Sequence, residues 1–580
     1  MTPRPPVPPT LAALAALLAA VPAVAQSPTP PAVAAAVRVN VVNVEVFVGD
    51  RQGRPVTDLT AADFALEEDG KPVVLTNFFA ARGPERKPAA LPDATAAPTA
   101  APEPAAPVGE EQRLNLVVFV DNGNISQVGR AAVFEQVRKL IREGTRPGDR
   151  IGLVSFDRAL KESQAFTEQP AEALAALDRM AKESAEGTYI ASQKSYLNRQ
   201  MASLDGSGLS GRDGFSGREA TTQMARNLLD QIDSFNEQTW QLYCDIMRGL
   251  VRFVDSLSGL PGRKVMLYVS DGPPMRVGQE LYEEFEARFP AVAGPNFNPV
   301  MRSTRFNLSQ YFRDVIHHAN AGRVTIYSVD AKTDRGLEGL SGETATMSAV
   351  PALGATETLN REASMIAFAG ATGGKFLPNT PGLGAALVRA ADDFGAYYSL
   401  GYSPAHLGDG KYHRLVVKVM RDGVSVRHRE GYLDKPEQER IADRTDAALL
   451  AAPAGDALGA RVSLGAGRKE SGKEYRVPLT LTIPAARIAL LDLGATHGGR
   501  LTVCVAAKDA GGRRAEPQCK GFEVAIPADK AAAWSRGDAT FSFDVRLWKG
   551  RCRLAVTARD EVSMEESTVV READVPLPSR

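Results

Sequence analysis

Four continuous apolar runs, each leading to a polar or acidic residue, constrain the fold of this chain more than any other feature. They read LNLVVFV from Leu114, DRIGLVSFD from Asp149, RKVMLYVSDG from Arg263 and GRVTIYSVDA from Gly322. A strand that is apolar on both faces is covered on both faces, as in a parallel sheet between two layers of helices. Segments with helical periodicity, such as GRAAVFEQVRKLIREG, follow several of the runs. The alternation predicts a doubly wound, Rossmann-like α/β domain over residues 112–402, with ALKESQAFT as an antiparallel edge strand.

The chain is longer than one hydrophobic core supports, since it has 580 residues. We expect β-rich domains on both sides of the α/β domain, because strand-like alternation and turn signals dominate there. Three connections inside residues 112–402 are long, and the glycine- and serine-rich one predicts a projecting loop. The expected parts are a small N-terminal β-domain, or part of one, at 37–80, an Ala/Pro-rich linker at 81–111, a β-hairpin extension at 403–432, a linker at 433–459 and an immunoglobulin-like β-sandwich at 460–580; the long connections are 189–237, 273–304 and 334–358.

The N-terminus has the pattern of an export signal. Residues 1–25 contain an early Arg, a short apolar stretch and the small-residue site Ala23-Val24-Ala25, followed by a low-complexity segment at 26–36. The apolar stretch is shorter than the ~20 residues of a membrane span, although an uncleaved anchor is the alternative. No later segment is long and apolar enough to span. We therefore expect an exported protein, located in the periplasm, at the cell surface or outside the cell.

Charge and cysteine content exclude several classes of protein. The 68 basic and 69 acidic residues nearly balance, which gives no argument for a nucleic-acid partner. Four cysteines are too few for a disulfide scaffold, but Cys504 and Cys519 flank a turn and could be bonded. The metal-ligand spacings CxxC and HxxxH are absent, so a zinc enzyme is not expected.

Two acids follow apolar runs at the carboxyl ends of predicted strands. Asp121 ends the first run and Asp271 follows the fourth strand of the domain, and Thr188 in EGTY lies between them in the sequence. Ligands of open α/β sheets bind beyond the carboxyl ends of the strands. The alternative is that each acid only caps a turn or a helix, as Asp does elsewhere.

These residues carry a family resemblance. Residues 114–402 resemble the von Willebrand factor type A domain, and residues ~37–432 are similar to a bacterial family with a "VWA-related, Acidobacterial" domain. The similar segments include VEVFVGDRQGRPVTDLTAADFALEEDGKP, GDRIGLVSFDRALKESQAFTEQPAEALAALDRM, KVMLYVSDG, ATGGKF and YYSLGYSPAHLGDGKYHRLVVKVMRDGVSVRHREGY.

The resemblance implies a metal-ion-dependent adhesion site built by Asp121, Thr188 and Asp271. Type A domains also place two serines in the first loop, where this chain has Gly123 and Ile125. Neither offers a side-chain oxygen, and Mg²⁺ needs six oxygens. The site is therefore expected to be degenerate, with Mg²⁺ or Ca²⁺ bound weakly or not at all and with Asn124 and Ser126 as auxiliary ligands.

We expect an exported, non-enzymatic adhesion protein that engages a protein partner through the strand-end face. The alternative is a structural component of a cell-envelope assembly with no metal dependence. A hydrolase ranks third, because no GxSxG motif occurs and ATGGKF departs from a phosphate-binding loop at Ala369 and Phe376.

Overall fold

The computed structural model describes residues 41–82, 113–157, 159–208, 215–332, 353–451 and 455–575. The expected signal peptide at 1–25, the low-complexity segment at 26–36 and residues 83–111 of the expected linker lie outside these ranges. Within the described residues, no helix is both long and apolar enough to cross a membrane.

The predicted α/β domain contains a six-stranded mixed sheet. Five strands are parallel, and β7 pairs antiparallel with β6 at one edge, as predicted. The strand order reverses at β5, whose eight residues are all buried. From one edge to the other the strands are β10 (Phe376–Leu377), β9 (Val324–Asp330), β8 (Arg263–Ser270), β5 (Leu114–Asp121), β6 (Arg150–Asp157) and β7 (Ala159–Thr167).

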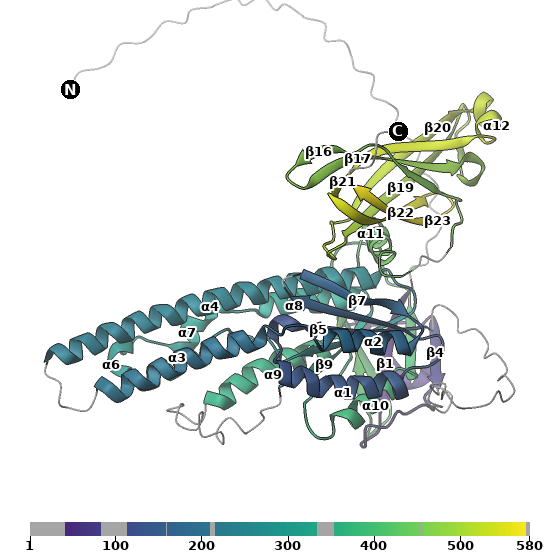
Figure 1. Ribbon diagram of the computed structural model, residues 1–580. Helices are drawn as coiled ribbons and strands as arrows, with labels where there is room; N and C mark the ends of the chain where they lie inside the picture. The colour runs from purple at the N-terminus through teal and green to yellow at the C-terminus, as the bar shows by residue number, and fades with distance from the viewer. Residues whose placement is uncertain are drawn as a thin grey trace, which may run out of the picture. The chain divides into compact units, whose positions relative to one another are not determined.

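Helices cover both faces of this sheet, which explains the continuous apolar runs. Along β5, Val117 and Phe119 enter one core and Leu116 and Val118 enter the other, because neighbouring side chains of a strand point to opposite faces. The first core includes residues of α4 (Phe215–Ser258), α8 (Ser309–Ala321) and α9 (Leu353–Ala371), and the second includes residues of α1 (Gln127–Gly144), α2 (Pro170–Met180) and α10 (Leu383–Asp393) (Figure 1).

The long connection expected at 189–237, which contains the expected glycine- and serine-rich loop, is helical over its described residues. They belong to α3 (Gly187–Gly208) and to the 44-residue helix α4, which lie side by side (Figure 1). Residues 209–214 lie outside the described residues. Buried positions recur along α4 every three or four residues, so helical burial decides the structure despite the nearby glycines. They include Leu228, Ile232, Tyr243, Met247, Leu250 and Val254.

The other two long connections differ in what the structure describes. Residues 273–304 contain three short helices, so this connection has secondary structure of its own: α5 (Gln279–Arg288), α6 (Pro290–Ala293) and α7 (Pro299–Ser303). Residues 334–352 of the last connection lie outside the described residues, and α9 begins at Leu353.

Segments that precede the central sheet in the sequence and segments that follow it together build two further four-stranded sheets. The first has the order β13-β1-β11-β4 and the second has the order β14-β12-β2-β3. Their apolar faces share one core that includes Val46, Leu66, Tyr402 and Leu415. The strands are β1 (Val42–Gly49), β2 (Phe64–Glu68), β3 (Lys71–Val73), β4 (Asn77–Arg82), β11 (Ala396–Tyr402), β12 (Tyr412–Val419), β13 (Ser425–His428) and β14 (Gly431–Leu433).

This arrangement differs from two sequence-based expectations. Strand β11 was expected inside the α/β domain, but it pairs with β1 and β4. The expected hairpin at 403–432 is wrong, because β12 pairs with β2 and β14, whereas β13 pairs with β1. Pairing with the distant strands lets the apolar face of β12 join a shared core, which a two-stranded hairpin alone does not provide.

The C-terminal residues form two antiparallel sheets that share one core. The disulfide Cys504–Cys519 joins β19 to β20, so the pairing left open by the sequence is present. Within the expected linker 433–459, residues Glu437–Ala447 form helix α11. The strands are β15 (Arg461–Leu464), β16 (Arg468–Ser471), β17 (Glu474–Pro484), β18 (Leu491–Asp492), β19 (Thr496–Asp509), β20 (Gln518–Pro527), β21 (Asp538–Trp548), β22 (Gly550–Asp560) and β23 (Glu566–Val575), with the short helix α12 (Ala531–Trp534) between β20 and β21.

Candidate functional site

Asp121 lies at the carboxyl end of the central strand β5 and is fully buried. Its Oδ2 accepts hydrogen bonds from the hydroxyls of Tyr268 at 2.7 Å and Ser270 at 2.9 Å, both on the neighbouring strand β8. Its Oδ1 is buried, and no donor among the described residues reaches it with hydrogen-bond geometry, although the nearby backbone N–H of Asn124 favours the ionised carboxyl and lowers its pKa. A buried carboxylate oxygen without a donor is costly, so this atom marks a place where a cation or a water would be favourable.

Asp271 follows directly after β8, beside Asp121. Its Oδ2 accepts a hydrogen bond from the backbone N–H of Ser126 at 3.0 Å, and its own N–H donates to the carbonyl of Asn124 at 2.9 Å. Its carbonyl accepts from Nε of Arg361 at 2.6 Å. The Oδ1 of Asp271 is also buried, and in the described part of the chain nothing donates to it. The structure thus brings both predicted acids to the loop after β5.

Burial raises the pKa of both carboxyls. Desolvation is the main cause for Asp121, whose pKa rises from 3.8 to about 6, and the charge of Asp271 adds to the rise. Desolvation likewise raises the pKa of Asp271 to about 6, although the nearby Arg361 guanidinium opposes this. At neutral pH both groups are mainly ionised, and a bound cation would relieve the cost of holding these charges in a low-dielectric site.

The loop between β5 and α1 supplies no further free side-chain oxygen. The Nδ2 of Asn124 donates to the Ser270 hydroxyl at 3.2 Å, and its Oδ1 accepts from the Tyr243 hydroxyl at 3.0 Å. The hydroxyl of Ser126 accepts from the N–H of Gly129 at 3.2 Å and caps α1. Both expected auxiliary ligands therefore have other hydrogen-bonding roles.

The two residues that replace the serines of the type A pattern serve packing. A Cβ at Gly123 would lie 2.8 Å from the side chain of Ile246, so a serine would not fit there without a shift. Ile125 is fully buried in the core beneath the second face of the sheet. The departure from the pattern is thus built into the packing of the loop.

Thr188 is the second residue of α3, and its side chain is exposed. Its segment does reach the loop after β5, because the N–H of Glu186 donates to the carbonyl of Asn122 at 2.8 Å. Among the described residues, no hydrogen bond links the Thr188 hydroxyl to either carboxylate. The structure therefore brings together the two acids and the backbone near Thr188, and its role as a ligand stays a prediction.

The donor set fits a hard cation only in part. The two unpartnered carboxylate oxygens suit Mg²⁺ or Ca²⁺, and Mg²⁺ commonly keeps several waters when few carboxylates bind it. The Arg130 guanidinium is buried and donates to the side chain of Asn122 at 2.8 Å, which fixes the loop in position. A hard cation held by two carboxylates and water is the chemistry that this arrangement supports.

Sequence reasoning missed the residues that support the two acids. Ser270 was the easiest of these to identify from the sequence, because it directly precedes Asp271 in the YVSDG run. Tyr268 lies two residues earlier, on the same face of β8. Arg361 and Tyr243 come from helices far away in the sequence, and no local pattern indicates their roles.

The fold and the site thus define a multidomain protein with a mixed α/β sheet. Two carboxylates lie at the carboxyl ends of neighbouring strands of this sheet. No protein-family model matches the sequence, and no curated protein matches it. Solved structures with some likeness include an aerotolerance-related membrane protein from Bacteroides fragilis NCTC 9343 and BatB from Bacteroides thetaiotaomicron, each with 8% identity, 49% of this chain and 98% of the other covered, and a TM-score of 0.21. The type V pili tip protein Mfa5 from Porphyromonas gingivalis is 11% identical to this chain. The match covers 92% of this chain and 78% of the Mfa5 chain, with a TM-score of 0.23. These values are too low to carry an argument about function.

Proposed function

We propose that this protein is an exported, non-enzymatic binding protein whose α/β domain is a von Willebrand factor type A domain. Its strand-end face engages a protein partner, and Asp121 and Asp271 form a degenerate metal-ion-dependent adhesion site. The single observation that carries the proposal is the pair of carboxylates, each with one buried oxygen that lacks a donor among the described residues. Under the same proposal, the C-terminal sheets form an immunoglobulin-like sandwich.

The site favours binding over catalysis. The two carboxylates lie at the end of a parallel sheet, where α/β proteins bind ligands. The hydroxyls nearest to Asp121 belong to Tyr268 and Ser270, which are buried beside it and donate to it. A hydrolytic site needs a nucleophile and a base that a substrate can reach, and these buried hydroxyls do not offer one. A bound cation with open coordination positions would instead accept a carboxylate from a partner.

A metal titration of the purified full-length protein tests the first half of the proposal. An ion at ten times its dissociation constant stabilises the folded state by about 1.4 kcal/mol. For a domain of this size that is a rise in melting temperature of ~3–6 °C. The rise should occur with Mg²⁺ or Ca²⁺, should reverse with EDTA, and should be absent in Asp121→Asn and Asp271→Asn. Asp178→Asn is the matched control, because this aspartate is exposed on α2.

Capture of exported proteins on the immobilised protein tests the second half. A partner that binds the wild type in Mg²⁺, and that is lost in EDTA and in Asp271→Asn, supports metal-dependent adhesion. A partner that binds the wild type, the variant and the EDTA-treated protein equally well would refute it. That result would favour the alternative of a structural component without metal dependence.

A further inference from the structure

Two histidines form a stacked pair beside the sheet β14-β12-β2-β3. His413 lies on β12, and His406 lies in the loop before this strand. Their ring centroids are 3.6 Å apart and their planes differ by 9°. Only 9% of the His413 side chain is exposed, compared with 21% of the His406 side chain. The charge state of a ring as buried as His413 depends mainly on the protein groups around it.

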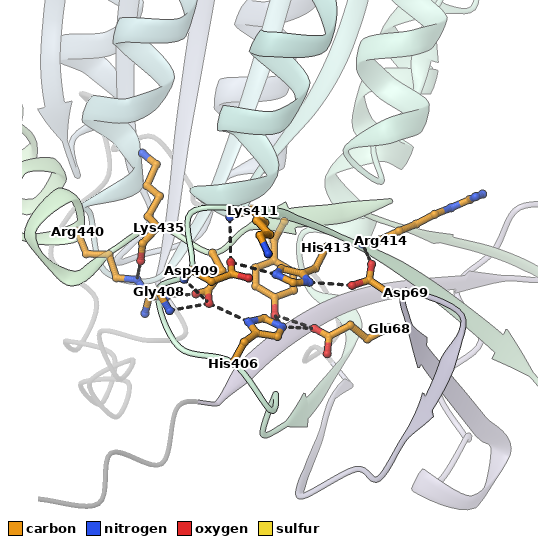
Figure 2. Close-up of polar contacts among 12 residues, drawn as sticks. Glu68, Asp69, His406, Gly408, Asp409, Lys411, His413, Arg414, Lys435 and Arg440 are labelled. Carbon is orange, nitrogen blue, oxygen red and sulfur yellow. Dashed lines mark hydrogen bonds and ion pairs between the residues drawn. The ribbon is translucent and has the colours of Figure 1, made fainter. Parts of the chain in front are cut away.

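The ring of His413 lies between two carboxylates from different segments. Its Nδ1 is 2.8 Å from Oδ2 of Asp69, which lies in the turn between β2 and β3. Its Nε2 is 3.2 Å from Oδ1 of Asp409, which lies in the loop before β12. Figure 2 shows the ring with one carboxylate at each end. The histidine therefore connects the loop to the turn after β2.

Only a protonated ring makes both contacts favourable. A neutral imidazole has one N–H donor, and an ionised carboxylate has none. Whichever nitrogen of His413 carries the single proton, the other nitrogen then presents a lone pair to a carboxylate oxygen, which is repulsive. The imidazolium has a donor on each nitrogen and can bind Asp69 and Asp409 at the same time.

Backbone N–H groups keep the two carboxylates ionised. Oδ1 of Asp409 accepts from the N–H of Lys411 at 2.9 Å, and this bond lowers the pKa of Asp409. Desolvation acts to raise the pKa of Asp69, but the N–H of Arg414, at 2.8 Å, and the His413 ring lower it. Desolvation likewise acts to lower the pKa of His413. Its hydrogen bonds to the two carboxylates outweigh this and raise its pKa above 6.5.

Acidic side chains outnumber basic ones around His413, which also favours its protonated form. His406 repeats the arrangement, with Nδ1 2.8 Å from Asp434 and Nε2 3.3 Å from Glu68. Because the His406 ring is more exposed, solvent compensates its charge more easily, and His413 is the ring that needs the proton. The groups that face the pair are Glu68 and Asp69 at the end of β2, Asp409 in the loop, Tyr432 and Asp434 at and after β14, and Arg440 of α11, which binds Asp434 at 2.7 Å.

Residues 408–411 form a surface turn whose position depends on these contacts. Gly408 and Gly410 have φ values of 62° and 74°, in the left-handed region that favours glycine. The N–H of Gly408 donates to the carboxylate of Asp434 at 2.6 Å, and the N–H of Gly410 donates to its carbonyl at 2.9 Å. The contact of Asp409 with His413 joins the same turn to β12. The two glycine amides therefore report whether the turn is closed.

We propose that His413 is a pH-sensitive clamp, whose protonated ring holds the turn at 408–411 against β12 and whose deprotonation releases the turn. The remaining proton stays at Nδ1, where the contact with Asp69 is shorter, so the contact with Asp409 is the one that is lost. The clamp's contribution to stability is complete below pH 6.5, the pKa of an unfolded histidine. It is lost as the pH rises through the higher pKa of the folded state. The clamp does not depend on the strand-end carboxylates.

NMR titration of the full-length protein with ¹³C-labelled histidine tests the first step. The chain has six histidines, and the His413 signal is the one missing from His413→Gln. The pKa of His413 should lie above 6.5, and Asp409→Asn should lower it. This variant should fold, because Asp409 is exposed and asparagine keeps the acceptor for the N–H of Lys411. Asp422→Asn is the matched control, since this aspartate is exposed in the turn after β12 and should leave the pKa of His413 unchanged.

Hydrogen exchange of residues 408–411 tests the release of the turn. After correction for the effect of pH on exchange itself, the protection of Gly408 and Gly410 should fall between about pH 6 and about pH 9. The fall should be about tenfold for each unit by which the pKa of His413 exceeds 6.5. It should be lost in His413→Gln and retained in His406→Gln.

Three results would overturn the proposal. The first is a pKa of His413 at or below 6.5, and the second is a pKa that Asp409→Asn leaves as unchanged as Asp422→Asn does. The third is protection of the turn that is equal at both pH values in the wild type, or that loses its pH dependence in His406→Gln instead of His413→Gln. In each case His413 is only a packed ring of the sheet.

Discussion

Replacing Asp121 with asparagine should change stability in a way that depends on pH. The pKa of the Asp121 carboxyl is about 6 in the folded wild type, whereas an aspartate in the unfolded chain has a pKa of 3.8. Because the folded state binds the proton more tightly, the wild type loses stability as the pH rises from about 4 to about 6, and the loss is complete above that range. Asparagine does not ionise, so the variant does not lose this stability.

The magnitude follows from the difference between the two pKa values. A separation of about two pH units corresponds to about 3 kcal/mol, and about 2 kcal/mol of this develops between pH 4.5 and pH 7.5. The stability of Asp121→Asn relative to the wild type should therefore rise by about 2 kcal/mol over this interval. Any constant effect of the new amide cancels, because only the change with pH is compared.

The assay is urea-induced unfolding followed by the fluorescence of Trp240. The chain has three tryptophans, and the other two, Trp534 and Trp548, lie in the C-terminal residues. With both changed to phenylalanine, the signal reports on α4, where Trp240 packs against the core of the α/β domain. A single probe of one domain is needed because a multidomain chain does not unfold in one step.

EDTA must be present, since a bound cation would favour the ionised carboxylate and hide the effect. Asp178→Asn is the control, and its exposed side chain should change stability by less than ~1 kcal/mol at both pH values. Equal relative stabilities of Asp121→Asn at pH 4.5 and pH 7.5 would show that the wild-type carboxyl carries no cost of burial. The electrostatic account of the strand-end pair would then be wrong.

Three further outcomes are expected. Replacing Cys504 and Cys519 with serine should lower the stability of the C-terminal sheets by about 3 kcal/mol, measured by denaturant unfolding, because the bond closes a loop of 15 residues; an unchanged midpoint contradicts this. Gly187→Ala should destabilise the α/β domain by ~1–3 kcal/mol, because the new Cβ would lie 2.6 Å from the backbone of the loop after β5. Gly370→Ala is its matched control, because Gly370 lies in α9 with open space around it, and this change should stabilise the domain by up to ~1 kcal/mol. If both variants melt above the wild type, or both melt below it, the packing argument is refuted. Glu45→Gln should lower the stability of the folded protein at neutral pH. The reason is that the Arg323 guanidinium holds the pKa of Glu45 at about 2, although desolvation acts to raise it. The wild type should lose this stability as the pH falls below about 4.5, so unfolding experiments in acid should show a smaller difference between the two proteins.

The strand-end acids were predictable because local sequence carries their signal. An apolar run that ends in an acid places a carboxyl at the edge of a parallel sheet, and Asp121 and Asp271 both obey this rule. The contact between His406 and Glu68 carried no such signal. His406 and His413 lack metal-ligand spacing, and Glu68 is 338 residues away from His406. Only the pairing of β2 with β12 brings these groups together.

Local periodicity determined the apolar strands of the central sheet, its antiparallel edge strand and several of the helices on its two faces, because each of these elements buries a pattern that is written within a few turns or a few strand residues. The sequence also assigned β11 to this sheet, and it did not indicate the helices at residues 189–237. Tertiary structure alone decided how the strands outside the central sheet pair. The segment read as one hairpin is divided between two sheets, since Leu415 faces Glu68 across one pair and His428 faces Val46 across another. The physical reason is that strand partners are selected by the apolar surface they bury together, and that surface exists only after distant segments have met.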